Sequence, residues 1–277
     1  MEAVYGRDIS EMLGTLSYQG LVDEVDAIMD VNPNDTHLRL HLKGRNPDDG
    51  MTAIAYDKGY FFLRLLEETV GRPAFDQFLK TYFTSHAFQI MDTDSFLIYL
   101  DDNLLTTESL KASVDVPAWV DGQGLPDNCP QVQSARLDLV DATLDEWVQG
   151  GKAASDLPWD QWLYQEKYRF LSNLPDDISS DRLAELDDAW SVNATGNNEV
   201  LFAWLEQAVR SRHTPAYERL EMFLIHVGRR KFLTPLYKAM VDTDQETMAE
   251  AIYKQARPNY HSVATGTMDE LLGHPSH

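Results

Sequence analysis

Apolar residues recur at helical spacing along almost the whole chain, and this periodicity constrains the fold more than any other feature. In ISEMLGTLSYQGLVDEVDAIM, and in most segments after residue 53, apolar side chains return every three or four positions. That spacing places them on one face of an α-helix. Short breaks rich in proline, glycine, asparagine or aspartate separate the segments, which favours antiparallel helix pairs. The sequence therefore predicts an all-α protein.

One segment departs from this period. In THLRLHLK, Leu38, Leu40 and Leu42 alternate with other residues, which is the pattern of a half-buried strand, and we expect a strand here. His37 and His41 would lie one turn apart on a helix and could then share a metal ion. Four residues along a strand span about 13 Å, however, which is too far for one ion. We therefore expect no metal site at this pair.

A stretch rich in proline and glycine divides the chain. The segment VDVPAWVDGQGLPDNCP has almost no periodicity and suits a connection between domains. We expect a first domain over residues 1–117, a linker over 118–132 and a helical C-terminal domain over 133–277. The helical segments after the linker are separated by short turns. This spacing favours a two-layer stack of the HEAT or armadillo kind, although no strict sequence repeat accompanies it.

The chain is strongly acidic, which excludes some partners. It has 23 lysines and arginines against 45 aspartates and glutamates, a net charge of −22. Such a chain repels nucleic-acid phosphates and anionic membrane surfaces, so we expect neither as a partner. No run of about 18 apolar residues could span a bilayer. The absence of a signal-peptide pattern and the single cysteine, Cys129, favour a cytoplasmic location in a reducing compartment.

Common catalytic motifs are absent, but one basic cluster stands out. The sequence contains no H-E-x-x-H, no P-loop and no G-x-S-x-G. In HVGRRKFLTPLYK, three cations, Arg229, Arg230 and Lys231, follow Gly228. They could form a solvated turn near the C-terminus of the preceding helix, where the macrodipole favours cations. From the pattern alone this interpretation is favoured. The alternative is an anion clamp, because arginine presents a fork that matches a carboxylate and lysine adds a point charge.

The stretch AIAYDKGYFF contains an oddly placed tyrosine. Ile54, Phe61, Phe62 and Leu65 form an apolar stripe at helical spacing. Tyr56 lies on roughly the opposite side at about 100° per residue, close to the start of the helix. A tyrosine of the core would lie within the stripe, so this position needs another explanation.

Five segments occur along the chain in a fixed order: AYDKGYFFLRLLEETVG, FLKTYFTSHAFQIMDTDSFLIYL, PAWVDGQGLP, WLYQEKYRFLSNLP and HVGRRKFLTPLYKAM. In this order they resemble the zinc aminopeptidases of the thermolysin-like class, and within it the leukotriene-A-hydrolase-type branch. The resemblance covers nearly the whole chain. It implies that residues 1–117 are the C-terminal helical portion of a thermolysin-like catalytic domain, followed by a HEAT- or armadillo-like domain.

The resemblance also implies roles for single residues. Tyr56 matches the family tyrosine whose hydroxyl donates a hydrogen bond to the oxyanion of the tetrahedral intermediate. A phenol with a pKa near 10 keeps its proton at neutral pH and can do so. Arg229 and Lys231 match the pair that holds the terminal carboxylate of the substrate. Asp48 matches an acidic residue that lines the cleft.

Two departures from the family pattern shape the expected function. The zinc ligands of the family, H-E-x-x-H and a later glutamate, lie upstream of the region matched here, so we expect no metal in this chain and zinc in a longer parent protein. The branch usually carries a second tyrosine where this chain has Met51. A thioether cannot donate a hydrogen bond. This difference favours peptide hydrolysis over an epoxide hydrolase activity.

The sequence therefore indicates a fragment of a zinc aminopeptidase that removes N-terminal residues from short peptides. The isolated chain is expected to be inactive, because nothing in it can activate water. Its partners would be the peptide substrate and the zinc-binding portion of the same protein, and an exposed truncation surface could support a homo-oligomer. The alternative is a non-catalytic helical scaffold that keeps the fold of an enzyme tail.

Overall fold

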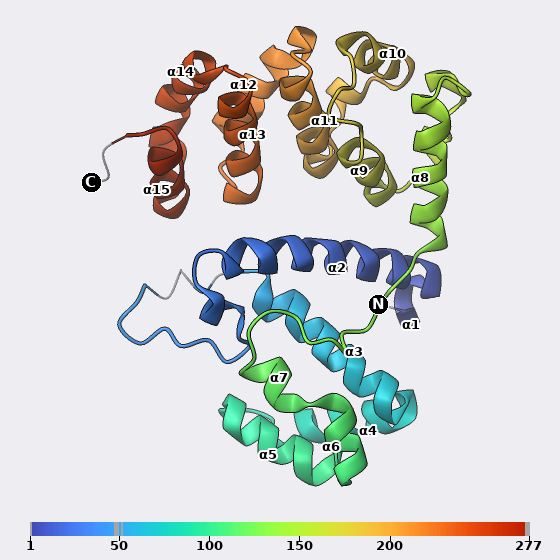
Figure 1. The fold of residues 1–277 in the computed structure, drawn as a ribbon, viewed down its shortest axis with the longest axis vertical. Coiled ribbons are helices and arrows are strands. Elements are labelled where there is room, and N and C mark those ends of the chain that lie inside the picture. The colour runs from blue at the N-terminus through green and yellow to red at the C-terminus, as the bar shows by residue number, and fades with distance from the viewer. Residues whose placement is uncertain (1, 47–49, 51, 275–277) are drawn as a thin grey trace. The chain divides into compact units, whose positions relative to one another are not determined.

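The structure, a computed structural model, describes residues 2–46, 50 and 52–274, and these residues form helices and no strand (Figure 1). The prediction of an all-α fold is confirmed. The chain divides into two compact units, residues 1–134 and 135–277. The first unit contains α1 (Glu2–Tyr5), α2 (Arg7–Met29), η1 (Pro33–Thr36), η3 (Ile54–Lys58), α3 (Gly59–Val70), α4 (Arg72–Ser85), α5 (Thr93–Asn103), α6 (Glu108–Val114) and α7 (Val116–Val120).

Helix α3 lies at the centre of the first unit. It packs against α4, α6 and the η3 turn, and η3 in turn packs against α2. Of the apolar stripe predicted from the sequence, Ile54, Phe61 and Phe62 are almost completely inaccessible, whereas Leu65 is only partly buried. Leu66 completes the buried face of α3. Phe61 also makes edge-on contacts with the rings of Tyr18 and Tyr60. Burial of such aromatic side chains, at about 25 cal/mol per Å² of apolar surface, supplies much of the driving force for this unit.

The residues expected to form a linker, 118–132, lie within the first unit. Trp119 is fully buried, and its indole N–H donates a 2.9 Å hydrogen bond to the Asn128 side-chain oxygen. Cys129 and Val132 are also part of the buried core. The prolines and glycines of this stretch make it irregular, but its side chains pack as a core does.

The prediction of a strand around residues 37–42 is wrong. These residues form an irregular segment, in which Arg39 N–H donates a 3.0 Å hydrogen bond to the Val120 carbonyl. The alternating leucines turn inward locally instead of pairing in a sheet. A Cβ added at Gly50 would lie 2.8 Å from the Leu40 side chain and 2.9 Å from that of Leu42. A larger residue at position 50 would displace the ends of these two leucine side chains.

The second unit is a stack of helices in two layers (Figure 1). Its elements are α8 (Ala135–Val148), η4 (Ala154–Asp156), η5 (Trp159–Gln161), α9 (Tyr164–Ser172), α10 (Ser180–Trp190), η6 (Val192–Ala194), α11 (Asn198–Arg210), η7 (Thr214–Ala216), α12 (Tyr217–His226), α13 (Arg230–Asp242), α14 (Glu246–Ala256), η8 (Arg257–Asn259) and α15 (Ser262–Leu271). One layer contains α9, α11, α13 and α15, which contact one another in that order, and α12 packs against α14 in the other. Helix α11 is buried on almost all sides, as expected of a central helix.

Among the described residues, no helix combines the length and the apolar character needed to cross a bilayer.

Candidate functional site

Tyr56 lies on a π-helical turn that leads into α3. The turn is η3, and the N–H of Gly59 bonds back to the carbonyl of Ile54, one residue further than in an α-helix. Ile54 is buried in the core, whereas the Tyr56 side chain is 70% exposed. The wider turn therefore presents the phenol to solvent while its first residue stays in the core. Single π-helical turns of this kind are frequent at functional sites.

Lys58, at the end of the same turn, is fully buried. Its ammonium donates hydrogen bonds to the carbonyl of Thr36 at 2.7 Å and to that of Gly122 at 3.0 Å. Burial lowers the pKa of Lys58 to about 8, because water no longer stabilises the charged form. At neutral pH the Lys58 amine is therefore protonated in most molecules and can donate all its hydrogen bonds.

The other ionisable neighbours of the turn are shifted by burial as well. Burial raises the pKa of the Asp57 carboxyl, and a hydrogen bond with Ser17 opposes this shift. Burial also raises the pKa of the Cys129 thiol to about 11, with the positive charge of Lys58 acting in the opposite direction. The thiol is therefore protonated at neutral pH, as expected for a cysteine that is not a nucleophile.

Arg229 and Lys231 lie together at the N-terminus of α13. Arg229 is the N-cap residue and Lys231 the second residue of the helix. Both cations lie near the ring of Phe232, at 5.6 Å for the Arg229 guanidinium carbon and 4.7 Å for the Lys231 Nζ. Phe232 is itself buried against Phe202 and Phe223, which fixes the ring beneath the two charges.

Lys231 already has a carboxylate partner. Its Nζ lies 2.5 Å from Glu199 Oε1, at the start of α11. Arg229 makes no ion pair within the part of the chain that the structure describes. The cations also stand at the positive end of the α13 dipole, where like charges are unfavourable by roughly 0.3–1 kcal/mol each. A helix N-terminus with added arginine and lysine is suited to binding an anion.

Two residues discussed from the sequence, Asp48 and Met51, lie outside the described residues. Tyr56 belongs to the first unit, and Arg229 and Lys231 belong to the second. The structure brings the two cations together around one aromatic ring.

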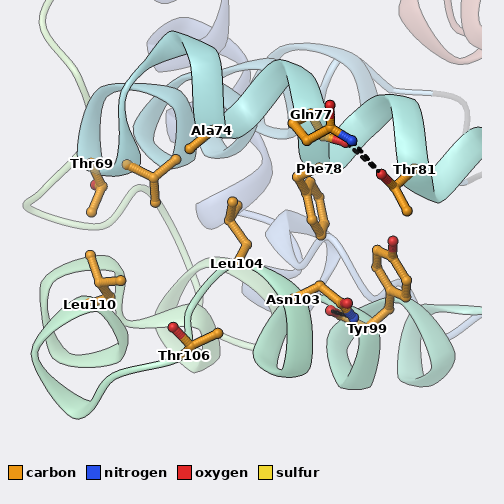
Figure 2. A pocket seen from close by; sticks show the side chains of 11 residues that line it. Thr69, Ala74, Gln77, Phe78, Thr81, Tyr99, Asn103, Leu104, Thr106 and Leu110 are labelled. Atoms are coloured by element: carbon orange, nitrogen blue, oxygen red, sulfur yellow. Dashed lines mark hydrogen bonds between the residues drawn. The ribbon is translucent and has the colours of Figure 1, made fainter.

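A cavity of 560 Å³ in the first unit contains none of the predicted site residues. Figure 2 shows how Phe78 from α4 and Tyr99 from α5 approach each other across it, with their ring centroids 5.3 Å apart. Its lining is neutral, and its polar groups bond largely within their own helices, as in the 3.0 Å bond from the Gln77 amide to the Thr81 hydroxyl. The cavity is a groove between packed helices rather than part of the candidate site.

Sequence reasoning missed Lys58 and Glu199. Lys58 carried a signal, because it stands four residues after Ile54 and three before Phe61, within the apolar stripe. A lysine in such a stripe either extends to solvent or is buried with partners. Glu199 carried none, since it meets Lys231 only through the packing of α11 against α13.

Two segments of the chain match known family models. Residues 7–116 match the peptidase family M1 domain, and residues 162–272 match the C-terminal domain of leukotriene A4 hydrolase. The chain is therefore similar to the M1 peptidase domain in its first part and to the C-terminal domain of leukotriene A4 hydrolase in its second. The predicted resemblance to this class of aminopeptidases is thereby confirmed.

Curated relatives agree with this assignment. Leucine aminopeptidase 2 of Pyricularia oryzae is 28% identical over 274 residues, which are 96% of this chain and 44% of the relative. A leukotriene A-4 hydrolase homolog of Botryotinia fuckeliana is 25% identical over 276 residues, which are 98% of this chain and 42% of the relative. The chain therefore spans about half the length of the relatives that it matches.

Solved structures share the fold. The yeast LTA4 hydrolase in complex with bestatin has a TM-score of 0.86 and is 23% identical, over 98% of this chain and 47% of that chain. Native leukotriene A4 hydrolase from Saccharomyces cerevisiae has a TM-score of 0.77 with the same identity and coverage. At this identity the likeness establishes the fold of the chain.

Zinc is the metal that the similarity to M1 peptidases implies, and the described residues of this chain do not fit it. Within the described residues, no three histidine, cysteine, aspartate or glutamate side chains lie close enough together to hold a metal ion. The full sequence also has no H-E-x-x-H motif. The described residues therefore take part in no step that needs a metal ion bound to them.

Proposed function

We propose that this chain is the C-terminal part of a zinc aminopeptidase that removes N-terminal residues from short peptides. The similarity of residues 7–116 to the M1 peptidase domain and the names of the curated relatives support the reaction class. The observation that carries the proposal is the exposed phenol of Tyr56 on a π-helical turn whose last residue is anchored in the core. Such a phenol is available to a ligand and belongs to a fixed piece of backbone.

In this proposal Tyr56 donates its hydroxyl hydrogen bond to the oxygen of the scissile carbonyl as negative charge develops there. The donor matters more in the transition state than in the bound substrate, so its contribution is to turnover. Arg229 and Lys231 bind the terminal carboxylate at the far end of the peptide. In the complete enzyme the zinc is bound by other residues. The isolated chain therefore has no peptidase activity.

The test is the Tyr56→Phe variant in the whole protein. Loss of one oxyanion donor typically lowers kcat about 10² to 10³-fold. We expect a decrease of that size with KM little changed, measured on a fluorogenic aminoacyl substrate. Tyr164→Phe is the matched control, because Tyr164 is also an exposed tyrosine and lies in the second unit.

The isolated chain provides the second arm of this test. With zinc added and the same substrate, we expect no chelator-sensitive turnover. A rate near that of the whole enzyme would refute the proposal, and so would a Tyr56→Phe enzyme that retains full kcat.

A further inference from the structure

Lys58 is an unusual residue to find in a core. Lysines are almost never fully buried unless they are paired, and Lys58 has no carboxylate partner among the described residues. Two backbone carbonyls take the place of water around its ammonium, those of Thr36 and Gly122. The arrangement is directional, because each carbonyl accepts along a defined line.

The two carbonyls belong to segments far from Lys58 in the sequence. Thr36 is the last residue of η1, and Gly122 follows α7. One further bond joins these segments to each other, because the Thr36 hydroxyl accepts a hydrogen bond from the Gly124 N–H at 2.8 Å. The same hydroxyl donates to the Pro33 carbonyl of its own turn at 2.6 Å. Lys58 therefore ties the π-helical turn to two loops that are themselves linked.

Stability alone does not explain a cation at this position. An apolar side chain at position 58 would continue the stripe of Ile54 and Phe61, and replacing a buried charge by a well-packed apolar group is often neutral or stabilising. An apolar group cannot hold the turn in one orientation through hydrogen bonds. The π-helical turn needs such bonds, because its wider hydrogen-bond ring is rare and survives only where its surroundings support it.

We propose that Lys58 is a positioning residue for Tyr56, holding the π-helical turn against the Thr36 and Gly122 carbonyls so that the phenol keeps one orientation. The inference rests on the proposed function of Tyr56 as a hydrogen-bond donor. Tyr56 is two residues from the anchor, and its own side chain is 70% exposed. A misplacement of about 1 Å in such a group can lower a rate by about 10²-fold.

A double-mutant cycle in the whole protein tests the inference, with Lys58→Met, Tyr56→Phe and the double variant. We expect Lys58→Met to lower kcat about 10- to 100-fold with KM nearly unchanged. In the Tyr56→Phe background the same substitution should lower kcat less than about twofold, because the group it positions is gone. Additive effects would overturn the inference and indicate a purely structural role.

The outcomes separate this inference from the proposed function. Full kcat in Tyr56→Phe refutes the function of Tyr56 itself. A large loss in Tyr56→Phe together with full kcat in Lys58→Met keeps that function and refutes the positioning role.

A second measurement needs no activity and uses the chain itself. Fluorine NMR of 3-fluorotyrosine at position 56 should give one narrow resonance, which shifts or broadens in Lys58→Met. Lys80→Met, a substitution of an exposed lysine on α4, is the control and should leave the resonance unchanged. An unchanged resonance in a folded Lys58→Met chain would overturn the inference.

If Lys58→Met does not fold, Thr36→Val replaces it. This variant keeps the carbonyl that Lys58 binds and removes the two hydroxyl hydrogen bonds that support it. We expect the same change in the fluorine resonance, smaller in size. No change would count against the positioning role.

Discussion

At the scale of single residues, the buried ring of Phe232 lies close to two cations, Arg229 and Lys231. The ring attracts both charges through its negative face, at about 0.5–1 kcal/mol for each exposed cation. In the proposed function, Glu199 would compete with the substrate carboxylate for Lys231. The affinity of the proposed clamp would then depend partly on a residue whose charge repels the substrate.

The proposed clamp predicts opposite effects for two substitutions in the whole protein. Arg229→Ala should raise KM for peptides with a free C-terminal carboxylate. Glu199→Gln should lower that KM by up to about fivefold, because an exposed ion pair is worth roughly 0.2–1 kcal/mol. The readout is the ratio of KM values for free-acid and amidated forms of one peptide.

The control for this pair is Glu206→Gln, which breaks an ion pair with Arg210 elsewhere on α11. It should leave the ratio unchanged. Equal changes in KM for the free-acid and amidated peptides would show that Arg229 and Glu199 act without reading the carboxylate.

At the scale of secondary-structure elements, a buried carboxylate joins α14, η8 and α15. Asp269 accepts a 2.6 Å hydrogen bond from the Tyr253 hydroxyl and forms an ion pair with Arg257. The Arg257 guanidinium and the Tyr253 hydroxyl together lower the pKa of Asp269 to about 2. These contacts hold the last helix of the second unit on its neighbours.

The lowered pKa of Asp269 makes this part of the fold sensitive to acid. A carboxyl with a depressed folded-state pKa stabilises the fold above its ordinary value near 4, and this stability is lost as pH falls towards 2. Asp269→Asn should lower the free energy of unfolding at pH 7 by about 1–3 kcal/mol, because it leaves buried partners unpaired. The difference from the parent chain should shrink between pH 4 and pH 2.

Chemical denaturation at several pH values measures this difference. Asp242→Asn is the control, since Asp242 pairs with Lys238 on the exposed side of α13 and should contribute less than about 0.5 kcal/mol. A difference between Asp269→Asn and the parent that stays constant down to pH 2 would contradict the role given to Asp269.

The sequence predicted most of these elements because helical periodicity is a local signal. The helices of the second unit follow the helical periodicity and short turns expected after the linker. The periodicity is weakest at α15, because SVATGTMDEL has few large apolar residues. This helix is held by Asp269 and by its packing against α13. The prediction of a strand around Leu40 was wrong because an alternating pattern does not supply a partner strand. The leucine side chains pack close to Gly50 instead.

The candidate site was predictable in part, for a similar reason. The resemblance singled out Tyr56, Arg229 and Lys231, and the structure adds their surroundings. The buried ammonium of Lys58 and the pairing of Lys231 with Glu199 depend on contacts between distant segments. A single sequence contains no pattern that predicts either of these two contacts.

At the scale of the whole molecule, surface charge and exposed apolar residues act against each other. The net charge of −22 keeps copies of the chain apart. Within the first 60 residues, however, Val4, Tyr5 and Val31 are each at least 60% exposed. Salt screens the repulsion and leaves apolar attraction in place, since the Debye length falls to about 3 Å at 1 M.

The isolated chain should therefore associate with itself more strongly at high salt. Sedimentation at about 0.05 M and 1 M sodium chloride measures this, and a rise in dimer at 1 M is expected. Substituting Val4→Ser and Val31→Ser together should reduce the dimer. Leu139→Ser, an equally exposed change in the second unit, should have no effect. A monomer under both conditions would rule out the expected homo-oligomer.

The burial of Lys58 also has a practical consequence for chemical footprinting. Acylating reagents modify amines that water can reach, so the native chain should shield this one ε-amino group while the many surface lysines react. Any labelling at position 58 would then report transient opening of the surrounding backbone. The extent of labelling at Lys58 would therefore measure how often the turn that carries Tyr56 opens by local unfolding.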